Sequence, residues 1–268
     1  MKMKKILLSA FLMIFVANIS FAQDLISAPE AKKLVNSKNA VIVSTRSAED
    51  YAKVHIRNAV NISVDDLAST TDPKGVLKAP AELAKILGAQ GIEPSKKIVI
   101  YDTGSNKSAG RLYWILKYIG FNDVHILDGH MQAWRQARGP VTNAATKSSS
   151  ATFTTAVNAK IFADKAYVKS KLKTAVLVDV RDASELAEGI IPGAIHLQYN
   201  KVINEDGTVK SKAELESIFN TAGITKNKEV ILYCATSVRA GIVFLALTSV
   251  LDYPNVKVYD GAYNEWKL

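Results

Sequence analysis

Short apolar runs separated by polar segments recur along the chain, for example at 41–43 and 98–101, where Val and Ile predominate. Unbroken β-branched runs of this length are typical of strands buried on both faces in a parallel sheet. The segments 79–87 and 111–119 instead carry apolar residues at helical spacing. Strands that alternate with helices predict an α/β fold, in which ligands bind beyond the carboxyl ends of the strands.

This alternation occurs twice. Four pairs of segments match in the same order along the chain: 40–51 with 175–186, 55–62 with 190–197, 91–101 with 223–233, and 124–134 with 256–266. Ordered self-similarity of this kind indicates a tandem duplication. We therefore expect two domains of similar length, 24–140 and 152–268, joined by a polar linker at 141–151 that is rich in Ser, Thr and Ala.

The first 22 residues have the pattern of a secretory signal peptide. Lysines near the start precede an apolar run at 6–16, and Ser20-Phe21-Ala22 places small residues where a signal peptidase cuts, before Gln23. A membrane anchor is the alternative, but the run falls short of the ~20 residues that a spanning helix needs. We expect a periplasmic or secreted protein that has no membrane segment after cleavage.

Composition narrows the choice of chemistry. The chain of 268 residues has a net charge of +9, or +6 once the three leader lysines are removed. The basic residues are not interleaved with aromatic residues, so we expect no nucleic-acid partner, although a positive surface favours small anionic substrates. Cys234 is the one cysteine, which excludes an internal disulfide, and the four histidines lack metal-ligand spacing. We expect no metal and no cofactor.

Cys234 follows an apolar strand directly and opens a loop of small residues that ends at Arg239. A thiol at a strand end, near loop amides and the start of a helix, is in surroundings that favour the nucleophilic thiolate. Arg239 would add a fixed cation for an anionic substrate. The alternative, a structural buried cysteine, is the commoner case for a cysteine whose position is unknown.

The chain resembles the tandem-domain rhodanese family, the thiosulfate and 3-mercaptopyruvate sulfurtransferases. The resemblance is carried by these matches: Val178-Asp179-Val180-Arg181 followed by Ile191-Pro192-Gly193-Ala194-Ile195, the loop from Tyr233-Cys234 to Arg239-Ala240, Tyr259-Asp260-Gly261 with Trp266, and Leu127-Asp128-Gly129 with Trp134. It implies two rhodanese-like domains, each a mainly parallel sheet flanked by helices. It also implies that Cys234 accepts a sulfane sulfur as a persulfide and passes it to a thiophilic acceptor such as cyanide.

The two copies differ where this chemistry is expected. Asp102 stands in the first copy where Cys234 stands in the second, so we expect the first copy to contribute shape and no chemistry. The Asp102 carboxylate would accept hydrogen bonds from its own loop. In the catalytic copy we expect the loop residues to bind the donor: Ala235, Thr236, Ser237, Val238 and Arg239.

Three residues outside the loop have two interpretations each. Asp179 and Arg181 either contact the substrate or form an ion pair within the domain. His55 matches a position where some relatives place a histidine near the domain cleft, and it is otherwise a hydrogen-bonded surface residue.

Four residues separate Cys234 from Arg239, which is one fewer than in the cysteine phosphatases of this fold. A narrower loop suits a terminal sulfur better than a tetrahedral phosphate, so we favour sulfur transfer. Thiosulfate is the expected donor because Arg239 suits a sulfonate-like anion. Thr236, however, keeps the hydroxyl of the mercaptopyruvate-type loop, so 3-mercaptopyruvate stays the alternative donor. A persulfide carrier or binding module without turnover is a further alternative.

Overall fold

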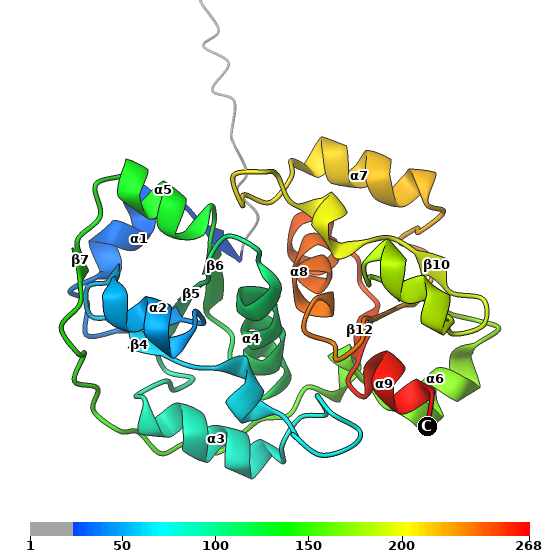
Figure 1. Ribbon diagram of the computed structural model, residues 1–268, viewed down its shortest axis with the longest axis horizontal. Coiled ribbons are helices and arrows are strands. Elements are labelled where there is room, and N and C mark those ends of the chain that lie inside the picture. The colour runs from blue at the N-terminus through cyan, green and yellow to red at the C-terminus, as the bar shows by residue number, and fades with distance from the viewer. Residues whose placement is uncertain (1–23) are drawn as a thin grey trace, which may run out of the picture.

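The computed structural model describes residues 24–268, and the predicted signal peptide at 1–22 lies outside this range. The described chain contains two sheets of the same design, each with five parallel strands. The strand order is β1-β6-β5-β2-β4 in the first half and β8-β12-β11-β9-β10 in the second. The predicted duplication is therefore carried into the topology, and both halves have the expected α/β fold (Figure 1).

The elements of the first half are β1 (Leu25–Ile26), α1 (Ala28–Leu34), β2 (Ala40–Ser44), α2 (Ala48–Lys53), β3 (His55–Ile56), β4 (Val60–Asn61), the 3₁₀ turn η1 (Val64–Leu67), α3 (Pro80–Ala89), β5 (Lys97–Tyr101), α4 (Lys107–Tyr118), β6 (Val124–Leu127), α5 (His130–Gln136) and β7 (Val141–Thr142). Those of the second half are η2 (Ala159–Ile161), β8 (Phe162–Ala163), α6 (Lys165–Lys171), β9 (Val176–Asp179), η3 (Ala183–Glu188), β10 (Ile195–His196), η4 (Tyr199–Val202), α7 (Lys212–Thr221), β11 (Val230–Tyr233), α8 (Ala240–Leu245), the π-helical turn η5 (Ala246–Val250), β12 (Val256–Tyr259) and α9 (Ala262–Trp266). Among residues 24–268, no helix is long and apolar enough to cross a membrane.

Both faces of each central strand are buried, which explains their unbroken apolar sequences. In β11, Val230 and Leu232 point into a core that both halves share, whereas Ile231 and Tyr233 point into an outer core under α6 and α9. Alternate residues of β5 divide in the same way between the shared core and a second outer core. The side-chain period of two in a strand makes this division necessary.

The connection between the halves is longer than the predicted linker. Its start, β7, pairs with β3 of the first half. Beyond it, the amides of Ala151, Ala156 and Asn158 donate hydrogen bonds to carbonyls of the first half. Residues 152–158, predicted to begin the second domain, therefore lie along the first one, because their backbone groups find partners there.

Helices α4 and α8 cross at the centre of the molecule (Figure 1). Gly110 and Gly241 meet at the crossing, and a Cβ atom on either residue would collide with the backbone of the other helix. Glycine is needed here because the two backbones approach closely. The shared core continues on both sides of this contact, through Leu112 and Ile115 of α4 and Ile242 and Leu245 of α8.

In each half, a loop also makes a hydrogen bond to the other half. The Asp260 carboxylate accepts a hydrogen bond from the Leu77 amide of the first half (2.8 Å), and the Asp128 carboxylate accepts one from the Val209 amide of the second (2.8 Å). These two contacts are related by the internal repeat, since both Asp and both amide positions are 132 residues apart. The Leu77 contact fixes the first-half loop whose Gly75 lies against Thr236, in the loop that follows Cys234.

Candidate active site

The thiol of Cys234 lies where the sequence predicts it. Strand β11 ends at Tyr233, Cys234 comes next, and α8 begins at Ala240. Cys234 is 1% exposed, and its carbonyl accepts a hydrogen bond from the Tyr263 amide (2.9 Å). The Ala235 carbonyl accepts one from the Asn264 amide (3.1 Å). The start of the loop is therefore fixed by α9, the helix after the Asp260-Gly261 motif.

Ser237 shapes the loop from within. Its φ angle of 59° is in the left-handed region, and its buried hydroxyl donates to the Tyr259 carbonyl. Ser237 was expected to bind the donor, but its hydroxyl is engaged with the end of β12. Thr236 and Val238 are half-buried and line a cavity, so these two side chains are the ones that the loop offers to a ligand there.

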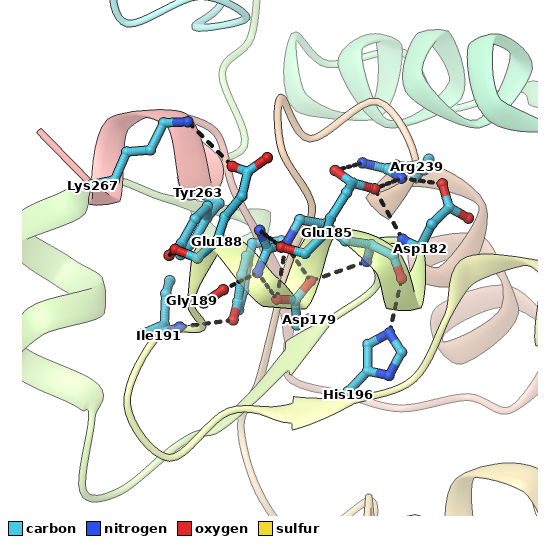
Figure 2. A network of polar contacts seen from close by, with 12 residues as sticks. Asp179, Asp182, Glu185, Glu188, Gly189, Ile191, His196, Arg239, Tyr263 and Lys267 are labelled. Atoms are coloured by element: carbon cyan, nitrogen blue, oxygen red, sulfur yellow. Dashed lines mark hydrogen bonds and ion pairs between the residues drawn. The ribbon is translucent and has the colours of Figure 1, made fainter.

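Arg239 differs from the expectation of a free cation at the mouth of the loop. One nitrogen of its guanidinium, Nη1, donates to Asp182 (2.6 Å) and to Glu185, and Nη2 donates to the other oxygen of Glu185 (2.8 Å) (Figure 2). Its side chain is 12% exposed. Two carboxylates therefore neutralise the positive charge that was expected to hold a substrate anion.

The pKa values of this cluster follow from its geometry. Burial acts to lower the pKa of Arg239, but the hydrogen bond to Glu185 and the proximity of Cys234 outweigh it, so the pKa lies above its ordinary value. The hydrogen bond from Arg239 lowers the pKa of Glu185, against the opposing effect of burial. Arg239 therefore connects the end of the Cys234 loop to the η3 segment that carries Asp182 and Glu185.

Asp179 and Arg181 form the ion pair that was one of their two interpretations. The Arg181 Nε and Nη2 atoms donate to the Asp179 carboxylate, with distances of 2.6 to 3.0 Å. Nη2 also donates to the Gly189 carbonyl (2.6 Å), and the guanidinium stacks on the Tyr263 ring at 3.8 Å. Both side chains are at most 1% exposed, so they brace η3 and α9 rather than face a ligand.

A cavity of about 360 Å³ lies between the two halves, next to the loop that runs from Cys234 to Arg239. Thr236 and Val238 of the loop form one side, and Val64, Lys74, Gly75 and Arg111 of the first half are among the residues opposite. The contact is close, because a Cβ atom on Gly75 would lie 2.7 Å from the Thr236 Cβ. Pockets between domains are common positions for substrate sites.

The corresponding loop of the first half is filled by its own carboxylate. Asp102 accepts hydrogen bonds from the amides of Gly104 (2.7 Å), Asn106 (3.2 Å) and Ala109 (3.3 Å), which confirms the expected structural role. His130 supports it: Nδ1 accepts from the Asp102 amide (2.9 Å), and Nε2 therefore donates to the Asn106 side chain (2.8 Å). Burial lowers the pKa of His130, consistent with this neutral form.

His55 lies neither at the cleft nor on the surface. It is 0% exposed, stacks on Tyr51 at 3.8 Å and bonds the Tyr51 carbonyl through Nδ1 (2.8 Å). The pairing of β3 with β7 holds it on the outer side of the first half. Among residues 24–268, no three His, Cys, Asp or Glu side chains converge as a metal site requires.

The partners of Arg239 and the first-half residues that line the cavity were not predicted from the sequence. Asp182 and Glu185 are more than 50 residues from Arg239, so only the fold brings them together. A signal for Arg111 existed: it interrupts an apolar helix face at the position where the second copy has Ile242. A charged residue inside such a face calls for a buried partner, and Asp260 provides it at 3.0 Å.

The rhodanese-like domain model matches the chain twice, at residues 27–137 and 163–268. The chain belongs to the rhodanese-like family. It is 32% identical over 233 residues to a 3-mercaptopyruvate sulfurtransferase of Escherichia coli, covering 82% of each chain. It is 30% identical over 237 residues to a thiosulfate sulfurtransferase of Pseudomonas aeruginosa, covering 84% of this chain and 87% of that one.

A crystal structure of an Escherichia coli 3-mercaptopyruvate sulfotransferase superimposes with a TM-score of 0.83 at 29% identity, covering 90% of this chain and 99% of that chain. The tandem rhodanese fold predicted from the repeat is therefore confirmed. Within this family, the chain is a sulfurtransferase that takes sulfur from a donor and gives it to an acceptor.

Proposed function

We propose that this sulfurtransferase takes its sulfur from thiosulfate and holds it as a persulfide on Cys234. The observation that carries the proposal is the position of the one cysteine, at the end of β11 and beside an interdomain cavity lined by the cysteine's own loop. Asp102 occupies the equivalent position in the first half and cannot form a persulfide.

The reaction requires two balanced steps. The Cys234 thiolate attacks the outer sulfur of thiosulfate, the S–S bond of thiosulfate breaks, and sulfite leaves with the bonding electron pair. A thiophilic acceptor such as cyanide then attacks the outer persulfide sulfur, forms thiocyanate and restores the thiolate. The amides of Ser237 and Ala240 correspond to the Asn106 and Ala109 amides that bind Asp102, and this correspondence supports a role for them in stabilising the terminal sulfur.

3-Mercaptopyruvate is the second candidate donor. Thr236 lines the cavity and carries the hydroxyl of the mercaptopyruvate-type loop, and one of the relatives is named for that donor. Asp182 and Glu185 neutralise Arg239, so its charge does not by itself favour thiosulfate over 3-mercaptopyruvate. Both donors carry an anionic group at the end remote from the transferred sulfur.

Steady-state kinetics with each donor and cyanide test the proposal. We expect sustained turnover with thiosulfate and a higher kcat/KM than with 3-mercaptopyruvate. A higher kcat/KM with 3-mercaptopyruvate would reverse the choice of donor. A single stoichiometric release of product, followed by no turnover with either donor, would instead identify a carrier.

We further propose that the protein is exported and that the mature chain begins at Gln23. The order of basic, apolar and small residues before Gln23 supports this. Mass determination of the N-terminus of protein purified from its bacterial host tests it, and an N-terminus that retains Met1 would contradict it.

A further inference from the structure

The first half places two basic side chains on the cavity beside the loop that runs from Cys234 to Arg239. Arg111 of α4 and Lys74 of the loop before α3 line it, and Asp65 is the one carboxylate among its lining residues. Arg239, the cation of the catalytic loop, is held by Asp182 and Glu185 and does not line the cavity. The cationic groups nearest to a ligand in this cavity therefore belong to the half that has no thiol.

Arg111 has unused hydrogen-bonding capacity. Its side chain is 1% exposed, and one nitrogen, Nη2, donates to the Gly75 carbonyl (2.9 Å) and to Asp260 (3.0 Å). The other nitrogen, Nη1, is buried and has no hydrogen-bond partner among residues 24–268. An unsatisfied N–H of a buried guanidinium is costly, and an anion is the partner that satisfies it best.

We propose that Arg111 and Lys74 bind the anionic group of the sulfur donor, so that the first half contributes charge as well as shape to the active site. This inference rests on the proposed function. A donor whose sulfur enters the Cys234 loop must place its oxyanion away from the thiol, and the wall opposite Thr236 and Val238 is formed by the first half. The sulfonate of thiosulfate and the carboxylate of 3-mercaptopyruvate both fit this polarity.

The contacts around Arg111 also fix the position of the first half relative to the second. Asp260 of the second half holds both the Arg111 guanidinium and the Leu77 amide, and Gly75 lies between these contacts and Thr236. The α4 helix that carries Arg111 is in turn fixed against α8 at Gly110. Arg111 is thereby oriented before any donor arrives, which reduces the entropy cost of binding.

The test measures binding of an inert oxyanion, sulfate, to the full-length Cys234→Ser protein by isothermal titration calorimetry. Lys74→Gln and Arg111→Lys are introduced separately into this background. Lys74 is exposed, so its variant is expected to fold. Arg111→Lys keeps a cation beside Asp260 but removes the second terminal nitrogen, the unpartnered Nη1. Lys85 is an exposed lysine on α3 outside the cavity, so Lys85→Gln is the matched control.

We expect sulfate to bind about fivefold more weakly in each cavity variant and equally well in the Lys85 control, because Lys74→Gln removes a nearby cation and Arg111→Lys removes a charge-assisted hydrogen-bond donor. In the Cys234 protein, the same two substitutions should raise KM for thiosulfate more than they lower kcat. Equal sulfate affinity in all four proteins would overturn the inference, whatever the turnover. Weakened sulfate binding in a protein that does not use thiosulfate would instead refute the proposed donor and leave the anion site standing.

Discussion

At the scale of single residues, Asp102 and Cys234 show how one position serves two purposes. Both follow a central strand, and both open a loop that leads into a helix at the domain interface. The Asp102 carboxylate takes three amide hydrogen bonds from its own loop. The loop after Cys234 is held in another way, by the Ser237 hydroxyl on the Tyr259 carbonyl and by the α9 amides on the Cys234 and Ala235 carbonyls.

The structure gives Arg239 surroundings that differ from those predicted from the sequence. Arg239→Ala would leave Asp182 and Glu185 without their cation beside the thiol. We expect a loss of about 2–4 kcal/mol in transition-state stabilisation, measured as kcat/KM for thiosulfate, because unpaired carboxylates repel an anionic donor.

A substitution of Glu185 tests whether the loss in Arg239→Ala comes from unpaired charge or from lost packing. Glu185→Gln in the Arg239→Ala background should restore part of the lost kcat/KM, since one unpaired carboxylate is removed. Glu216→Gln, an exposed position on α7, should restore nothing. A failure of Glu185→Gln to rescue would indicate that Arg239 acts on the donor directly, as the sequence alone suggests.

The lowered pKa of Glu185 makes a further prediction about stability. Because its pKa in the folded protein lies below the ordinary value of 4.5, the ionised Glu185 stabilises the fold above that pH. The contribution is lost as the pH falls through the folded pKa. Glu185→Gln should therefore reduce the free energy of unfolding by about 1 kcal/mol at pH 7, and the difference from wild type should shrink below pH 4.5 in urea titrations. A difference that is constant with pH would contradict the ion pair.

At the scale of elements, the strands and helices around each loop could be predicted because their apolar patterns are local. The run at 98–101 lies in β5, and the segments 79–87 and 111–119 largely coincide with α3 and α4. The environment of the site could not be predicted in the same way. The partners of Arg239, and the approach of Arg111 to Asp260, depend on side chains that only the finished topology brings together.

The crossing of α4 and α8 leads to an element-scale prediction. Gly110→Ala would place a Cβ atom against the backbone of Gly241 and Ile242. Overpacking of this kind costs about 1–3 kcal/mol, and the shift of α4 should also displace Arg111. We expect a lower Tm together with a higher KM for the donor. Unchanged stability in thermal unfolding would show that the two helices separate easily.

At the scale of the whole molecule, the two halves form one structural unit. The shared core contains Trp114 and Leu112 of the first half and Phe244 and Leu247 of the second. The tandem repeat predicts two domains of the same design, but not that they bury their inner faces against each other. Helix α8, which the catalytic loop leads into, is consequently buried by the first half.

This shared core predicts cooperative unfolding. We expect a single urea transition in which tryptophan fluorescence and far-UV circular dichroism coincide, because neither half can keep its inner face buried alone. Two of the three tryptophans, Trp114 and Trp134, report on the first half and Trp266 on the second. Two separated transitions would contradict the account of one folding unit.

The central claim is that Cys234 carries the transferred sulfur, and intact-mass spectrometry tests it most directly. Full-length protein is incubated with thiosulfate in the absence of an acceptor, and Cys234→Ser is treated in parallel. We expect a gain in mass of one sulfur atom that disappears when cyanide is added and is absent from the serine variant. A gain that persists in Cys234→Ser, or no gain in the wild type with either candidate donor, would contradict it.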